Sequence, residues 1–198
     1  KYWAMENVPR VAKILERELG IGGQLSRFRP LVSVNMVVNA SDYGVPQARK
    51  RMIAGHFPLN LFLSYKQMTP TRTLGDVLDA LSKDIITDPV YGIELPAKEV
   101  TDNYYEAPLN HEEERINRAA KTFHPIYNNM SFPDLESRPS RTITATCTRV
   151  SRESIIVEDH RGSNSFRRLN IRERGVLQSF PITYQFHGKS YSSRFKMI

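Results

Sequence analysis

The first 57 residues alternate between strand-like and helix-like hydrophobic periods, and this order restricts the chain to folds that combine helices with a sheet. Residues 2–8 alternate as a strand does, and residues 11–19 have the spacing of a helix that Gly20 ends. The apolar face of this helix is formed by Val11, Ile14, Leu15 and Leu19. Apolar runs at 31–38 and 52–57 predict two more strands, so the region reads as the later part of an α/β sheet.

Two capping boxes mark helix starts further along the chain. Thr73 with Asp76 predicts a short helix with an apolar face, and Asn170 with Glu173 predicts a second one. Between them, residues 110–123 are rich in Glu at the start and in Lys and Arg at the end, which favours a polar helix aligned with its own dipole.

The remaining middle region predicts less regular structure. Residues 84–108 have little apolar periodicity, which indicates an irregular segment. The β-branched runs at 141–150 and 153–159 predict a hairpin. Cys147 lies in the first run without a neighbouring base, so we expect a small buried side chain rather than a nucleophile.

Positive charge is unevenly distributed along the sequence. The chain carries a net charge of +7, and residues 138–198 hold 12 Lys and Arg against 4 Asp and Glu, whereas residues 1–137 hold 16 against 17. A polyanion such as nucleic acid is the natural partner for such a segment, and a solvated basic surface is the alternative.

Several classes of protein are disfavoured by what the sequence lacks. There is no apolar run of membrane-spanning length and no signal-like opening, so we expect a soluble cytoplasmic protein without a membrane partner. A single cysteine and five histidines without ligand spacing predict neither a disulfide nor a metal site. The chain starts and stops inside patterned segments, so we expect a piece of a longer protein.

Three motifs follow one another in the sequence. The first is Glu-Asn-Val at residues 6–8, and the second is Gln-x-Arg-x-Arg at residues 47–51. The third comprises Arg167 or Arg168, Leu169, Arg172, Glu173, Leu177, Gln178, Phe180 and Pro181. Alone, each has a plainer interpretation: a strand end before a helix, an exposed basic turn, and an amphipathic helix. In this order they resemble the DNA cytosine-C5 methyltransferase family, over nearly the whole chain.

The resemblance implies an α/β fold in three parts. Residues 1–65 would be the later part of a Rossmann-like catalytic domain, residues 66–166 a small, mainly β target recognition domain, and residues 167–198 a helix and strand returning to the catalytic domain. It also implies that S-adenosylmethionine is the methyl donor and double-stranded DNA the partner. The family's glycine-rich cofactor loop and its Pro-Cys nucleophile loop have no counterpart in this sequence, so we expect residues 1–198 alone to be inactive.

The resemblance assigns roles to the residues that match its first two motifs. Glu6 would face N3 and the exocyclic amine of a cytosine that has left the duplex, and Asn7 would orient the neighbouring loop. Arg51 would hold the base and the adjoining phosphate. Gln47 and Arg49 would brace the loop beside them.

Within the expected recognition domain, the resemblance marks two further DNA-binding residues. Thr142 would contact the phosphate beside the flipped base, with Arg141 assisting, although an ordinary strand threonine is the alternative. Two other functions stay open: a DNA-binding specificity module that works with a separate catalytic half, and a degenerate homologue with a structural role.

Overall fold

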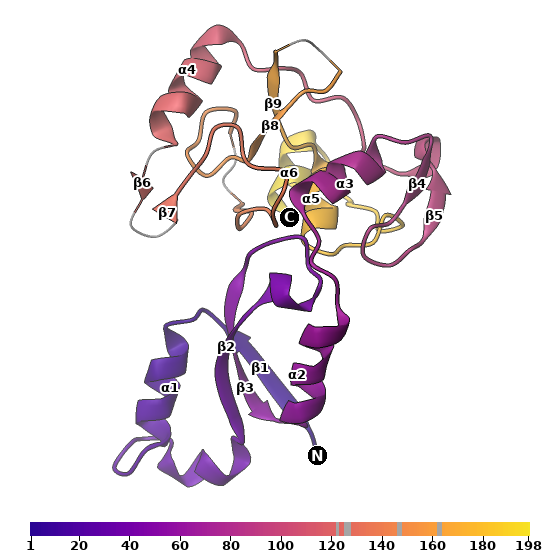
Figure 1. Cartoon of the computed structure of the whole chain (residues 1–198). Coiled ribbons are helices and arrows are strands. Elements are labelled where there is room, and N and C mark those ends of the chain that lie inside the picture. The colour runs from indigo at the N-terminus through magenta and orange to yellow at the C-terminus, as the bar shows by residue number, and fades with distance from the viewer. Residues whose placement is uncertain (122, 125–127, 146–147, 162–163) are drawn as a thin grey trace. The chain divides into compact units, whose positions relative to one another are not determined.

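The computed structural model describes residues 1–121, 123–124, 128–145, 148–161 and 164–198. The chain divides into two compact units (Figure 1). The first unit contains residues 1–44 and 48–71, and the second contains residues 45–47 and 72–198. Helices and small sheets occur together in both, which confirms the predicted α/β class.

The first unit is built around a three-stranded sheet in the order β1-β3-β2. Its elements are β1 (Trp3–Asn7), α1 (Val11–Leu19), the 3-10 helix η1 (Ser26–Leu31), β2 (Val34–Asn39), the 3-10 helix η2 (Ala40–Tyr43), β3 (Lys50–His56) and α2 (Leu59–Met68). Both β1 and β2 run antiparallel to β3, which lies between them. The carboxyl ends of β1 and β2 therefore meet the amino end of β3 at one end of the sheet.

Helix α1 covers one face of this sheet. Its Leu15 and Leu19 pack on Met52 and Ala54 of β3, and Gly20 ends the helix as predicted. Ile14 was expected on the same apolar face, but its side chain is 44% exposed. Alternation along β3 places Arg51 on the face opposite Met52, and Lys50 on the same face as Met52.

In its described residues, the second unit combines four α-helices and one 3-10 helix with short two-stranded sheets. Its elements are α3 (Leu74–Leu81), β4 (Ile85–Thr87), β5 (Glu94–Pro96), η3 (Ala97–Glu99), α4 (His111–Ala120), β6 (Phe123–His124), β7 (Asn128–Asn129), β8 (Ile156–Glu158), β9 (Phe166–Arg168), α5 (Ile171–Leu177) and α6 (Tyr191–Lys196). The capping boxes predicted for α3 and α5 are both present, and Asn110 caps α4 in the same way.

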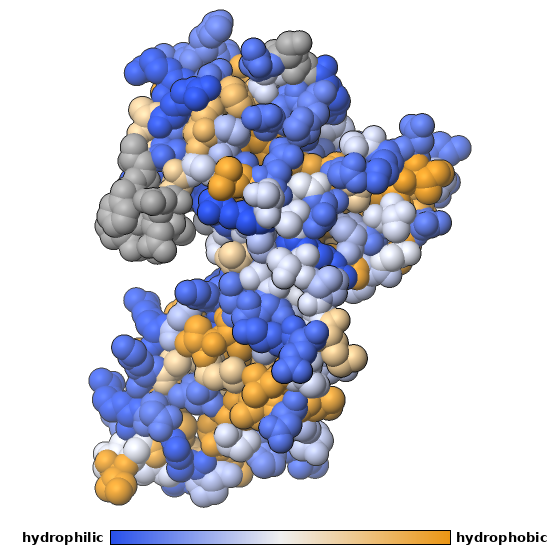
Figure 2. Space-filling view, in the orientation of Figure 1, coloured by the Kyte–Doolittle hydropathy of each residue, from blue (hydrophilic) through white to orange (hydrophobic). Residues whose placement is uncertain are grey.

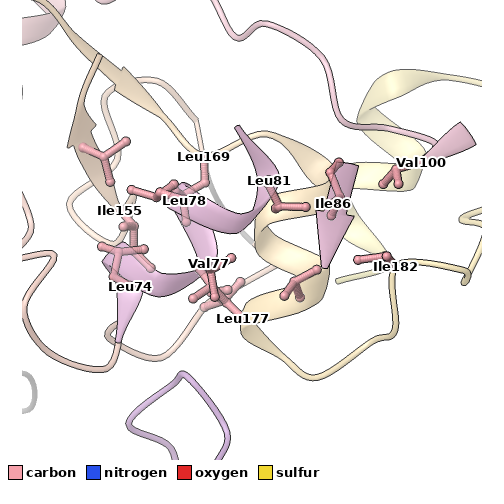
Figure 3. Packing of buried hydrophobic residues seen from close by; sticks show 13 residues of the cluster. Leu74, Val77, Leu78, Leu81, Ile86, Val100, Ile155, Leu169, Leu177 and Ile182 are labelled. Carbon is pink, nitrogen blue, oxygen red and sulfur yellow. The ribbon is translucent and has the colours of Figure 1, made fainter. Parts of the chain in front are cut away.

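One hydrophobic core joins the start of the second unit to its end. Leu74, Val77, Leu78 and Leu81 of α3 pack with Leu177 of α5 (Figure 3). The core is completed by Ile86, Val100, Ile143, Ile155, Val157, Leu169, Val176 and Ile182. Residues 72–166 and 167–198 therefore share a core, and residues 178–198 contain α6 rather than a strand.

The predicted hairpin between 141–150 and 153–159 is wrong. Strand β8 in the second run pairs with β9, with Val157 opposite Arg167. The first run forms no strand at 141–145 or 148–150, and Cys147 lies outside the described residues. The segment at 84–108, expected to be irregular, contains the antiparallel pair β4-β5.

None of the helices in the described ranges is both long and apolar enough to cross a lipid bilayer. The same ranges contain no cluster of three His, Cys, Asp or Glu side chains that could hold a metal ion.

Candidate active site at the end of the three-stranded sheet

Glu6 and Arg51 form an ion pair at the end of the sheet where β1 stops and β3 begins. Glu6 lies opposite Ile53 in the ladder, so its side chain shares a face with Arg51. Arg51 Nε lies 2.7 Å from Glu6 Oε1, with the two side chains 23% and 56% exposed. Arg51 Nη1 also donates to the carbonyl of Lys50 at 2.8 Å. The Glu6 carboxyl group is thus oriented by a guanidinium yet open to an incoming group.

Arg49 lies close to this pair and adds positive charge. Its carbonyl accepts a hydrogen bond from Ala40 N at 3.0 Å, which continues the pairing beyond the start of β3. Burial lowers the pKa of Arg49 and the charge of Arg51 lowers it further, whereas Glu6 raises it. One carboxylate therefore lies among two guanidinium groups, an arrangement that suits a polar base together with a phosphate.

Asn7 follows Glu6 but belongs to the other face of the sheet. It lies opposite Met52, and its Oδ1 accepts a hydrogen bond from Val8 N at 2.8 Å. This contact defines how the chain leaves β1, and α1 begins directly afterwards through a bond from Val11 N to Val8 O of 3.0 Å. The Asn7 side chain thus contacts the backbone at the point where the chain leaves β1.

Gln47, Arg141 and Thr142 belong to the second unit. Gln47 is fully buried and forms a parallel bridge with Ser140, whose N donates to Pro46 O at 3.0 Å. The side-chain amide of Gln47 makes no hydrogen bond in the described structure. The predicted residues thus fall into two groups, one at the sheet end and one beside Ser140.

Arg141 forms an ion pair inside the second unit. Its Nε and Nη2 donate to the two carboxylate oxygens of Asp134 at 2.6 and 3.1 Å, and Nη2 also donates to Ser154 O at 3.1 Å. The Arg141 side chain is only 13% exposed. Thr142 follows it in a half-buried position. Asp134 had no recognisable signal in the sequence, because its partners are distant along the chain.

The third motif builds the interior of the second unit. Arg167 pairs with Glu173 through bonds of 2.8 and 2.7 Å, and Glu173 accepts from Asn170 N at 2.8 Å in the capping box of α5. Burial, the largest single influence, lowers the pKa of Arg167, but its bond to Glu173 and the nearby carboxylates raise it above the ordinary value overall. These charged residues therefore hold α5 in place.

Arg172 is a fully buried member of the same motif. Its guanidinium donates to three backbone carbonyls, those of Thr101 at 2.8 Å, Pro181 at 3.2 Å and Tyr184 at 2.6 Å. Burial lowers the pKa of Arg172. The guanidinium links segments on either side of α5, so the match to the third motif reflects packing.

Part of the positive charge in residues 138–198 is balanced by ion pairs inside the second unit. Ion pairs of this kind are Arg141–Asp134, Arg149–Glu113, Arg167–Glu173, Arg168–Glu106 and Arg194–Asp102. The second unit holds 18 Lys and Arg against 17 Asp and Glu, a net charge of +1, whereas the first holds 10 against 4, a net +6. The excess positive charge of the folded chain thus lies in the first unit.

The sheet end does not by itself fit S-adenosylmethionine. Glu6 is more than half exposed, and its neighbours Arg49 and Arg51 are cations that suit an anion or a polar base rather than an enclosed adenosine. Cavities of about 500 and 840 Å³ are lined by residues of the second unit alone. We therefore assign no cofactor-binding residue.

Comparison with known proteins and protein families identifies the family of this chain. A search of curated proteins found no match. A family model described as C-5 cytosine-specific DNA methylase matches residues 1–198, the whole chain. The three motifs and the mixed α/β fold agree with this match, and the chain belongs to the C-5 cytosine-specific DNA methylase family.

Proposed function

We propose that residues 1–198 are the carboxy-terminal part of a DNA methyltransferase that transfers a methyl group from S-adenosylmethionine to C5 of a flipped cytosine in a specific duplex sequence. The observation that carries the proposal is the Glu6–Arg51 pair, because it places a partly exposed carboxyl group beside a guanidinium at the end of a sheet. Methylation at C5 requires a group that stabilises the ring while the methyl group arrives.

In this proposal the two side chains bind different atoms of the cytosine. The Glu6 carboxyl group binds N3 and the exocyclic amine, and the Arg51 guanidinium binds O2 and the adjoining phosphate. Arg49 raises the positive potential at the same place, which favours the phosphate. The nucleophilic thiolate comes from a segment outside residues 1–198.

The exposed edge of β1 supports the need for a further segment. All five residues of β1 are exposed, and β3 pairs with only one of its edges. Trp3 and Met5 are 40% and 37% exposed, and Tyr2 just before the strand is 75% exposed. Figure 2 shows hydrophobic residues on the surface of this unit. Natural sheets rarely leave such an edge open, so we propose that the missing catalytic half adds a strand beside β1.

The second group of predicted residues belongs to DNA recognition in this proposal. Thr142 contacts the phosphate beside the flipped base, and the Arg141–Asp134 pair holds the segment that carries it. Arg141 is then a positioning residue rather than a DNA ligand. Gln47, bridged to Ser140, belongs to the same segment.

A methylation assay on the complete enzyme tests the role of Glu6. The Glu6→Gln variant should transfer methyl groups at least about 100-fold more slowly than wild type, with a much smaller change in DNA affinity. The control is Glu16→Gln, the same chemical change in a carboxylate that pairs with Arg29, and it should keep near wild-type turnover. Glu6→Gln turnover within a few-fold of wild type would remove Glu6 from the chemistry.

A complementation experiment tests the role of the missing half. Residues 1–198 alone should show no methyl transfer and should bind S-adenosylmethionine with a dissociation constant weaker than about 10 μM by calorimetry. Addition of the upstream half, as a separate chain or in one reading frame, should restore activity. Transfer by residues 1–198 alone would contradict the proposal.

A further inference from the structure

The acidic side chains of the first unit are all engaged in ion pairs. Its four Asp and Glu residues are Glu6, Glu16, Glu18 and Asp42. Their partners are Arg51, Arg29, Arg17 and Lys66, at distances of 2.7 to 2.9 Å. Every residue of this unit is described, so no carboxylate side chain in it is left to neutralise the other six cations.

Three of these remaining cations lie on the face of the sheet that α1 covers. Arg10 is the N-cap residue of α1, directly before Val11, and Lys13 lies three residues later on the same side of the helix. Lys50 at the start of β3 shares a face with Met52, which packs on α1. All three cations are exposed, and Figure 2 shows hydrophilic residues over α1.

Lys50 connects these cations to the candidate site. Lys50 lies opposite Asn39 at the carboxyl end of β2, beside the sheet end that carries Glu6 and Arg51. Arg27, by contrast, lies in the 3-10 helix η1, whose Leu31 carbonyl accepts a hydrogen bond from Trp3 Nε1 at 3.0 Å, at the other end of the sheet.

We propose that Arg10, Lys13 and Lys50 form a second contact surface for duplex DNA, which binds backbone phosphates flanking the target cytosine. The inference rests on the proposed function. Arg51 and these three cations then act from opposite faces of one sheet end. Arg51 binds the extruded nucleotide, and the three cations on the face that α1 covers bind the duplex. The ligand is the phosphate backbone, because lysines and arginines that neutralise phosphates release the counterions condensed on the DNA.

The test compares two matched pairs of lysine substitutions in the complete enzyme. The first variant is Lys13→Gln with Lys50→Gln. The control is Lys98→Gln with Lys189→Gln, which removes the same charge from exposed lysines of the second unit. Affinity for a fluorescein-labelled duplex is measured by anisotropy across a series of KCl concentrations, with the target site present or scrambled.

The Lys13/Lys50 variant should reduce the slope of log affinity against log salt by about 1.8, since each phosphate contact contributes about 0.9. The reduction should be the same for target and scrambled duplexes, and the control should keep the wild-type slope. An unchanged slope in the Lys13/Lys50 variant, or an equal reduction in the control, overturns the inference. If the double variant fails to fold, each single substitution should reduce the slope by about 0.9.

Failure of this inference can be distinguished from failure of the proposed function. The salt dependence of DNA affinity in the Lys13/Lys50 variant tests the DNA surface, whereas loss of methyl transfer in Glu6→Gln tests the chemistry. A wild-type enzyme without methyl transfer but with the predicted slopes would overturn the proposed reaction and retain the DNA surface.

Discussion

The Nε atom of Arg51 lies 2.7 Å from Oε1 of Glu6 and joins the end of β1 to the start of β3. Both side chains remain partly exposed, so the pair contributes only about 0–1 kcal/mol to stability. An incoming nucleotide can therefore replace this contact at small cost. Substitutions at either position should report on DNA and chemistry rather than on folding.

Replacement of Arg51 by Ala should weaken DNA binding about equally for every sequence. Loss of one phosphate contact should reduce the slope of log affinity against log salt by about 1 without changing which site is methylated. Anisotropy titrations and bisulfite sequencing measure the two quantities. Arg29→Ala, which breaks the pair with Glu16 instead, is the control and should leave both unchanged. A shift in sequence preference in Arg51→Ala would mean that base reading occurs at this sheet end.

Local signals in the sequence predicted the elements that position the site. The alternation of residues 2–8 and the apolar spacing before Gly20 correctly predicted β1 and α1. The capping boxes correctly predicted α3 and α5, because a cap depends on residues three apart. Helix α2 was missed, since Pro58 provides no side-chain cap and no residue of this helix is buried.

The rest depends on partners that are distant along the chain. The β-branched run at 141–150 favours a strand by propensity. However, β8, its expected partner, pairs with β9, and Ser140 just before the run pairs with Gln47. The charge of the last third predicted a polyanion partner or a solvated basic surface, whereas carboxylates such as Asp134 and Glu113 pair with part of this charge in the fold. Neither partner choice is encoded in a local pattern.

Removal of the Asp134 carboxylate should strongly destabilise the second unit. Asp134 is 5% exposed and pairs with Arg141, and the fully buried Lys121 ammonium lies 3.9 Å away. Asp134→Ala leaves these buried cations without their carboxylate, which typically costs about 3–5 kcal/mol. Urea unfolding of residues 1–198 measures the change. The control is Asp79→Ala, which removes an exposed pair with Lys83 and should cost less than about 1 kcal/mol.

Substitution of Gly175 by Ala should destabilise α5 despite the better helix propensity of Ala. The gain in propensity is about 1 kcal/mol, but the added Cβ would lie 2.8 Å from Cζ of Phe186, a ring that is 6% exposed. Overpacking of this kind costs about 1–3 kcal/mol, so we expect a net loss in urea unfolding. A second substitution, Phe186→Leu, should cost less in the Gly175→Ala background than in wild type. A more stable Gly175→Ala variant would show that the ring moves aside freely.

Acid should destabilise the second unit partly through Glu113. The hydrogen bond from Arg149 holds the pKa of Glu113 below its ordinary value of 4.5. A lowered folded-state pKa stabilises the fold above the unfolded pKa, and this contribution is lost as pH falls through the folded value. Glu113→Gln, which keeps a capping residue for α4, should therefore show a smaller drop in unfolding free energy between pH 6 and about pH 3. Glu112 pairs with Arg115, which is 70% exposed, so the Glu112→Gln variant should lose nearly as much unfolding free energy over this pH range as wild type.

The shared core of the second unit determines how DNA specificity can be exchanged. Val157 of β8 belongs to the same buried core as Leu169 and Val176 of α5, so exchange of residues 84–137 and 141–159 alone would place foreign side chains in this core. Exchange of residues 45–47 together with 72–198 keeps the core intact. We expect the larger exchange with a relative to give a folded enzyme that methylates the relative's site, because base-edge contacts worth about 1–3 kcal/mol each are replaced while Glu6 and Arg51 stay. Bisulfite sequencing identifies the methylated site. If the site stayed that of the original enzyme, base reading would belong to the first unit, beside Arg51.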